Sequence, residues 1–359
     1  MDALLERLAL IYCLLAMLVA PVPDARLRAL AAAGVCLLGL AAAADEVAAS
    51  ATAGQFANLN ELLALAGSVV ALTGIVLGFR RREPEIRPAS TVSLMRLDPL
   101  LLTGLGLAAL APHLLWLGLG VLFALVAAAR TTLRARRLAW LLLLTLAVGL
   151  LGSAFALMFT ILGPESARLE RLGEGPFSPA AERLLGLLLG ASSLLLAGVP
   201  PLHRVPWGRA LAPLAALLIA RLVVPDFPLG LATWQVPAMA LLVAGLAAAA
   251  WSGHWPQAVV AGGLLALWSG LGGVSAGYVL VAWGWLVETG TALLSQRGIA
   301  LRTRWAALPA IPAALAALPA LTAGLSAQVL LSVAAVGGCA AGFVIEWKRG
   351  ARELQAPLY

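Results

Sequence analysis

The sequence predicts an all-α fold: a polytopic transmembrane helix bundle of about thirteen spans. Composition is the first reason, because 62% of the residues are apolar and only 11% are charged, against about 25% charged in a soluble domain. Pattern is the second, because apolar runs of roughly 17–25 residues, separated by short polar turns, fill the chain. Each such run is long enough to cross a bilayer core of about 30 Å as a helix. Membrane barrels would instead show alternating apolar and polar residues.

The apolar runs divide the chain into expected spans that belong to a single integral membrane domain, residues 1–359. In order they are 4–20, 27–44, 59–79, 98–111, 113–129, 138–162, 183–199, 209–224, 232–250, 257–274, 276–294, 306–323 and 325–346. The first three form an N-terminal segment, 1–90, and residues 347–359 form a tail. The first run ends at Pro21 without a small-residue cleavage site, which favours a retained helix over a signal peptide. The division at Pro112 is open, since one broken helix there would reduce the count to twelve.

The charged residues lie mainly in the loops and follow a pattern. Basic loops follow the first, third, fifth, seventh, eleventh and thirteenth spans, and neutral or acidic loops follow even-numbered spans. The clearest basic clusters are Arg80, Arg81 and Arg82, then Arg134, Arg136 and Arg137. The positive-inside rule therefore predicts an outside N-terminus and a cytoplasmic C-terminus in the cell inner membrane. This role explains the net charge of +7 without nucleic acid, although the same clusters could contact anionic lipid or a partner protein.

Two ionisable residues lie inside expected spans. Arg221 is about twelve residues into the eighth span, and Glu288 is central in the eleventh. A charge at this depth is costly unless it is paired, snorkels to the surface or faces water. We expect either an outward-snorkelling or structurally paired Arg221, or one facing a hydrated interior, with Glu288 as its most economical partner. Glu288 itself could be a structural pair, a proton site or a contact to a partner subunit.

Other chemistry is not indicated by the sequence. His113, His203 and His254 are too far apart to suggest a haem pair or a metal triad. The three cysteines lie within apolar runs, as packing residues do. There is no Gly-rich phosphate loop and no Ser/His/Asp pattern. We therefore expect no catalytic chemistry, no cofactor and no metal in this chain.

The order of features over about residues 95–335 resembles the antiporter-like membrane subunits of respiratory NADH:quinone oxidoreductases, membrane-bound hydrogenases, cation/proton antiporter complexes and bicarbonate-uptake complexes. The resemblance is carried by RRLAWLLLLTLAVGLLGSAFALMF (136–159), LLLAGVPPLHRVPWGRALAPLAALLIARL (194–222), AVVAGGLLALWSGLGGVSAGYVLVAWG (258–284) and LPALTAGLSAQVLL (318–331). The most specific piece is Ala-Gly-x-x-Pro-x-His followed by Ala-Pro and Leu-Leu. The resemblance implies an antiporter-like helix bundle and other membrane subunits as partners. It also connects His203 to proton uptake, whereas a loop histidine capping backbone carbonyls is the alternative.

The departures from that family concern its ionisable residues. The family's mid-membrane Glu falls near Gly120, and its lysines fall at Leu196, near Gly262 and near Gln328. The chain's one lysine, Lys348, lies in the tail. Proton relays need groups that change protonation, and arginine and glutamine do not serve in their place.

The sequence therefore favours a degenerate antiporter-like subunit of a respiratory or ion-translocating complex. It would act as a scaffold or retain a reduced charge-coupling role through Arg221 and Glu288. Its partner could be a hydrogenase-like, quinone-reductase or bicarbonate-uptake module. One alternative is a free-standing transporter of a small or lipid-linked solute, which would show interrupted helices in two halves. Another is an active proton channel that uses Glu288 and His203.

Overall fold

The computed structural model describes most residues between 98 and 285. These are 98–134, 138–163, 167–199, 202, 205, 207–251, 255–270 and single residues at 274, 277, 278, 280–282, 284 and 285, besides 34, 37, 41 and 44. Of this part, 88% is helical and none is strand. Five of its helices are long and apolar enough to cross a membrane. The all-α class is confirmed for these residues, and the count of thirteen is not confirmed by them.

The helices follow one another with short connections. They are α5 (Pro99–Leu110), α6 (Leu114–Arg134), α7 (Leu138–Leu162), the 3₁₀ turn η1 (Leu169–Glu174), α8 (Pro179–Ala197), α9 (Gly208–Leu218), the π-helical η2 (Ile219–Val223), α10 (Val224–Asp226), α11 (Pro228–Trp251) and α12 (Trp255–Trp268). Helices α5 and α6 are separate, which confirms the division at Pro112.

Several boundaries differ from the expected spans, and two of these differences have clear local reasons. Helix α8 begins at Pro179 rather than at 183, because Ser178 Oγ accepts the Ala181 N–H at 3.2 Å and Pro179 suits the first helical position. Helix α12 ends at Trp268 rather than at 274. Gly270 follows with a φ of 103°, a left-handed conformation that few other residues adopt.

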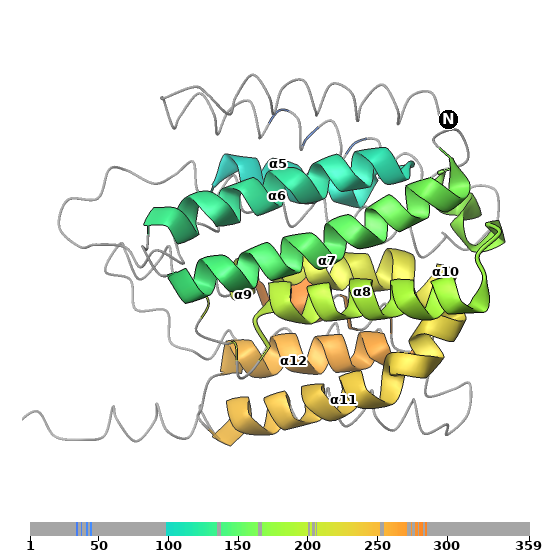
Figure 1. Cartoon of the computed structure of the whole chain (residues 1–359). Coiled ribbons are helices and arrows are strands. Elements are labelled where there is room, and N and C mark those ends of the chain that lie inside the picture. The colour runs from blue at the N-terminus through green and yellow to red at the C-terminus, as the bar shows by residue number, and fades with distance from the viewer. Residues whose placement is uncertain are drawn as a thin grey trace, which may run out of the picture.

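The helices run back and forth between two ends of the bundle (Figure 1). One end carries the α5–α6 turn, residues 167–178 with the turn η1, and α10. We call it the Asp226 end. Backbone bonds join its parts, since Leu114 N donates to Ala167 O at 2.8 Å and Leu169 N donates to Pro112 O at 3.1 Å. The α5–α6 turn is thus fixed against the loop that follows α7.

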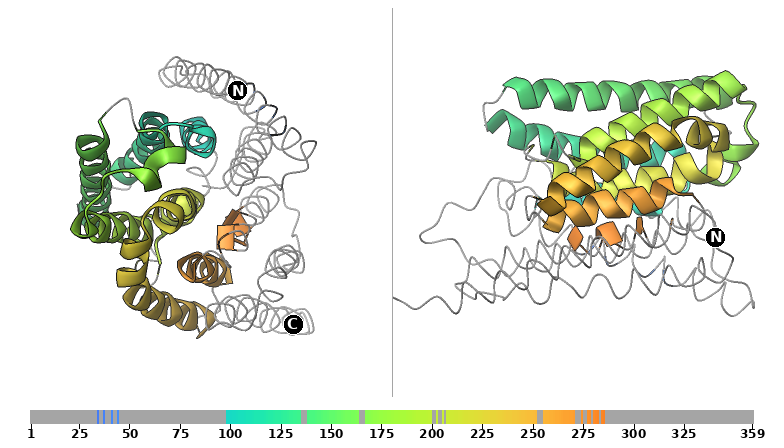
Figure 2. Two further views of the ribbon diagram at one scale, coloured as in Figure 1. Left: turned by 90° about the vertical axis from the view of Figure 1, so that its right-hand side faces the viewer. Right: turned by 90° about the horizontal axis from the view of Figure 1, so that it is seen from below.

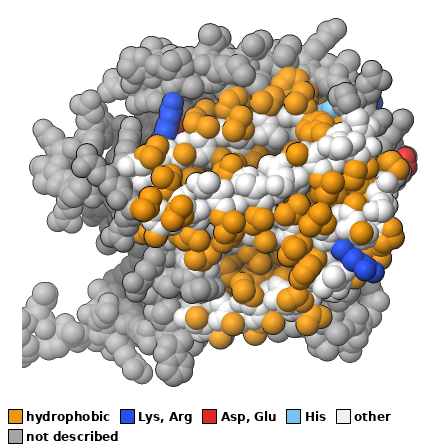
Figure 3. Space-filling view, in the orientation of Figure 1, with side chains coloured by type: hydrophobic (Ala, Val, Ile, Leu, Met, Phe, Trp, Pro, Cys, Tyr) orange, Lys and Arg blue, Asp and Glu red, His pale blue; other side chains and the backbone are white. Residues whose placement is uncertain are grey.

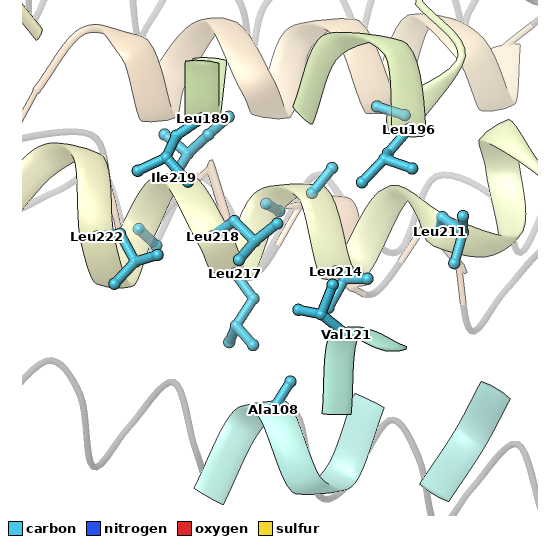
Figure 4. Packing of buried hydrophobic residues seen from close by; sticks show 14 of the residues in the cluster. Ala108, Val121, Leu189, Leu196, Leu211, Leu214, Leu217, Leu218, Ile219 and Leu222 are labelled. Atoms are coloured by element: carbon cyan, nitrogen blue, oxygen red, sulfur yellow. The ribbon is translucent and has the colours of Figure 1, made fainter. Parts of the chain in front are cut away.

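The continuous helix α9–η2–α10 lies at the centre of the described helices. In the end-on view of Figure 2 it is enclosed by α5–α8 on one side and by α11 and α12 on the other. Its most apolar 18-residue window is 89% buried, against 28% for α7 and 17% for α11. Figure 4 shows Leu189 and Leu196 of α8 on one side of it and Ala108 of α5 on the other. This helix therefore forms the core against which the others pack.

The outer helices expose apolar side chains. Figure 3 shows one face of the described residues covered with hydrophobic side chains and carrying few charged ones. Leu138 on α7 is 71% exposed and Val236 on α11 is 74% exposed. Apolar side chains are stable at such exposure when lipid rather than water surrounds them, as the hydropathy of these helices predicts.

Glycines allow the closest helix contacts. A Cβ atom placed on Gly186 of α8 would lie 2.5 Å from Gly230 Cα of α11. On Gly104 of α5 it would lie 2.6 Å from Gly120 O of α6. Because lipid supplies no hydrophobic drive for helix association, such close backbone packing is a main source of stability in membrane bundles.

The contact between α8 and α11 gives a direct test of this packing. We expect Gly186→Ala to lower the free energy of unfolding by about 1–3 kcal/mol, because the new methyl group overlaps backbone atoms that cannot rotate away. Gly149→Ala on α7 is the matched control, since no heavy atom lies within 4 Å of its new Cβ. Thermal unfolding of both variants in detergent measures the difference. Equal melting temperatures would contradict the packing.

Candidate functional site: a buried arginine at a helix terminus

The carboxyl end of α5 leaves backbone carbonyls without their usual helical donors. The carbonyl of Ala108 would accept from residue 112, which is a proline and has no N–H. Ala111 is the C-cap, with an extended ψ of 117°, as the residue before a proline prefers. The Leu115 N–H, which a continuing helix would give to Ala111 O, goes instead to His113 Nδ1 at 3.2 Å. These carbonyls are inside the protein, so other donors have to satisfy them.

Arg221 supplies those donors. Its Nη1 donates to Ala108 O at 3.0 Å and to Ala109 O at 2.8 Å, and its Nη2 donates to Ala111 O at 3.0 Å. The guanidinium is planar and holds its N–H groups in a fixed fork, which suits several carbonyls arranged around one helix end. Its positive charge also lies at the negative end of the α5 dipole. Arg221 therefore caps α5 across more than a hundred residues of sequence.

The backbone around Arg221 is itself unusual. Residues 219–223 form a π-helical turn, in which the Val224 N–H bonds to Ile219 O, five residues earlier. A π-turn accommodates one extra residue within a continuous helix and so changes which face the later residues occupy. Pro225 follows and cannot donate to Arg221 O, which removes one of the bonds that would favour an ordinary α-helical turn. The central helix thus changes its winding at the residue that contacts α5.

Two further titratable groups lie in the region of Arg221. Asp226 of α10 is at the end of the same helix, and its carboxyl group accepts the Gly173 N–H of η1. Tyr278 is in the segment beyond α12, and it is 2% exposed. Arg221 itself is only 8% exposed. The site therefore combines the buried Arg221 cation, the carboxyl terminus of α5, the carboxyl group of Asp226 and the buried phenol of Tyr278.

Helix α12 also ends at a side-chain cap from a neighbouring helix. Gln235 of α11 donates from Nε2 to Trp268 O at 2.9 Å, and Ser269 Oγ donates to Ala266 O at 2.6 Å. Helices α5 and α12 have 12 and 14 residues. At 1.5 Å per residue they are about 18 and 21 Å long, shorter than a bilayer core of about 30 Å. Both are thus short helices whose carboxyl ends bond to polar side chains of longer neighbours.

His113 has a local structural role at the start of α6. Its Nδ1 accepts the Leu115 N–H, as the side chain of a helix N-cap does. A paired backbone bridge also joins His113 to Arg168 in the loop after α7. The histidine therefore helps to fix the turn at which Arg221 binds α5.

The structure places only some of the residues that the sequence singled out. Arg221 is described, and an exposed fraction of 8% is too small for a side chain whose head snorkels into water. Arg134 is the last residue of α6. Glu288, His203, Arg80, Arg81, Arg82, Arg136 and Arg137 lie outside the described residues, so the pairing of Arg221 with Glu288 stays a prediction. Within the described part of the chain, no three His, Cys, Asp or Glu side chains come together to hold a metal ion.

Sequence reasoning missed the α5 carbonyls as partners of Arg221. It also missed Asp226, Tyr278 and Gln235 as the polar groups of this region. Pro112 was the available signal, because a proline that ends a buried helix leaves a carbonyl in need of a donor. Gln235 could have been found by the same reasoning, as an amide within an apolar run.

Replacement of Arg221 tests its role as the α5 cap. We expect Arg221→Ala to reduce the free energy of unfolding by about 2–4 kcal/mol, because three buried carbonyls lose a charged donor. Arg221→Lys recovers part of this loss, since an ammonium is a compact donor that does not match the fork. Arg130→Ala, at an exposed position on α6, is the control and changes stability by less than about 0.5 kcal/mol. The melting temperatures of the variants are measured in detergent. Equal melting temperatures for Arg221→Ala and Arg130→Ala would exclude the capping role.

Replacement of His113 separates capping from proton chemistry. His113→Ala removes the acceptor of the Leu115 N–H and should cost about 1 kcal/mol, whereas His113→Asn keeps a cap acceptor and should cost much less. Both replacements remove the titratable ring. A smaller loss of stability in His113→Asn than in His113→Ala supports the structural role. Equal losses of stability in the two variants would contradict it.

No family model, curated protein or solved structure matches this chain.

Proposed function

We propose that this chain is a degenerate antiporter-like membrane subunit that acts as a scaffold within a multi-subunit respiratory or ion-translocating complex. The observation that supports it most is the state of Arg221. Its guanidinium is buried and held by three backbone carbonyls, and an arginine does not release its proton in proteins. Such a group stabilises a bundle and is unsuited to relaying protons.

Two of the four positions at which the family resemblance places ionisable groups also favour a scaffold. Leu196 is fully buried among apolar side chains beside the central helix (Figure 4). A Cβ atom on Gly120 would lie 2.7 Å from Ala108 N, so a glutamate there would separate α5 from α6. Both positions contribute to helix packing, which supports the scaffold proposal.

The proposed setting is the inner membrane, with the N-terminus outside, the C-terminus cytoplasmic and about thirteen spans in all. The alternation of basic with neutral or acidic loops supports this orientation. The proposed partners are membrane subunits of a hydrogenase-like, quinone-reductase or bicarbonate-uptake module. The exposed apolar faces of α7 and α11 are compatible with lipid or with such subunits.

One observation favours a second candidate, a free-standing transporter of a small or lipid-linked solute. Transporters place interrupted helices at their substrate sites. Here α5 and α12 are short, and η2 interrupts the α-helical winding of the central helix. The two candidates differ in whether the chain works alone.

Native purification distinguishes the two candidates. The full chain, tagged at its C-terminus and expressed at its natural level, is solubilised in mild detergent and analysed by native electrophoresis and mass spectrometry. We expect a particle with other membrane subunits in fixed stoichiometry, which a harsher detergent dissociates. A stable, monodisperse chain on its own would reject the scaffold proposal.

Proton flux tests the remaining alternative, a channel that uses Glu288 and His203. In vesicles containing the native assembly, we expect Glu288→Gln to leave assembly and pH-gradient-driven flux nearly unchanged. Loss of flux with assembly intact would support the channel instead.

A further inference from the structure

We infer that the carboxyl end of α5 is a binding site for a guanidinium-type cation, and that the native chain fills it with its own Arg221. The inference does not depend on the scaffold proposal, because it concerns a site within the single chain. It follows from the donor pattern at the site, its enclosure and its charge.

The donor pattern favours a planar, forked cation. Two nitrogen atoms of one guanidinium reach three carbonyls, at 2.8–3.0 Å, from residues 108, 109 and 111. A spherical hard cation such as Ca²⁺ takes six to eight oxygen ligands, and Mg²⁺ requires an octahedron. A single ammonium lacks the fixed fork. The arrangement is therefore matched to a guanidinium rather than to a metal ion.

The enclosure arises from small and apolar residues. Ala108, Ala109 and Ala111 are at most 1% exposed, and their methyl groups leave room for the guanidinium against the helix end. Removal of the arginine side chain would leave a space between these alanines and the central helix, since the surrounding structure relaxes only partly.

The charge of the site also requires a cation. A helix carboxyl terminus carries about half a negative charge, and the guanidinium of Arg221 lies against that terminus. A neutral molecule of the same shape would satisfy the carbonyls without balancing this charge. Urea has that shape, so it separates the contribution of charge from that of hydrogen bonding.

The test is restoration of an Arg221→Ala variant by free guanidinium. The full chain in detergent is heated with and without millimolar guanidinium chloride, at ionic strength matched with sodium chloride. We expect the melting temperature of Arg221→Ala to rise by about 2–4 °C, as for a ligand that binds only the folded state. Urea at the same concentration should give no rise.

Three proteins serve as controls for this rescue. Wild type and Arg221→Lys keep the site filled, and Leu222→Ala removes a buried side chain from the same helix without emptying the site. None of them should be stabilised by guanidinium. A rise shared by Leu222→Ala, a rise given equally by urea or sodium chloride, or no rise in Arg221→Ala would overturn the inference.

A measurement of folded yield covers the case in which Arg221→Ala does not survive purification. Membranes containing the variant are solubilised with or without guanidinium, and the monodisperse fraction is measured by size exclusion. We expect guanidinium to increase that fraction several-fold for Arg221→Ala and not for Leu222→Ala. Equal yields with and without the ion would reject the site.

Discussion

The structure depends on one constraint, the need to satisfy backbone carbonyls where helix α5 ends inside an apolar protein. Burial within the protein keeps water from these carbonyls, and Pro112 removes the donor that a continuing helix would provide. Arg221 meets this need with three hydrogen bonds and a charge of the right sign for a helix carboxyl end. The cost of burying an arginine and the cost of burying a helix end thus offset each other.

This interaction accounts for the arrangement of its neighbours. The central helix has to bring residue 221 to α5, and its π-helical turn lies at that residue. The α5–α6 turn has to stay in place to receive Arg221. Two backbone hydrogen bonds join this turn to residues 167–169, and the Leu115 N–H bonds to His113 Nδ1 within it. Around this core, glycine contacts such as Gly186 with Gly230 draw α8 and α11 together. Polar capping and close backbone packing therefore act together.

The same interaction bears on function. A group that carries protons has to gain and lose them during the cycle, and a buried arginine bonded to three carbonyls keeps its charge. Leu196 and Gly120, at the positions where the family resemblance puts ionisable residues, contribute instead to apolar and backbone contacts. A chain with these properties can determine the shape of a membrane assembly while other subunits perform the chemistry. The proposed scaffold role is the function most consistent with such a core.

The sequence by itself determined the all-α class, the apolar character of helices long enough to cross a membrane, most helix boundaries in the described part and the presence of a charge within an apolar run. It did so because hydropathy and proline act locally, over one span or one turn. Only the tertiary structure decided what the charge binds. The partners of Arg221 are backbone carbonyls about 110 residues away, and every residue has such a carbonyl, so no residue type marks them.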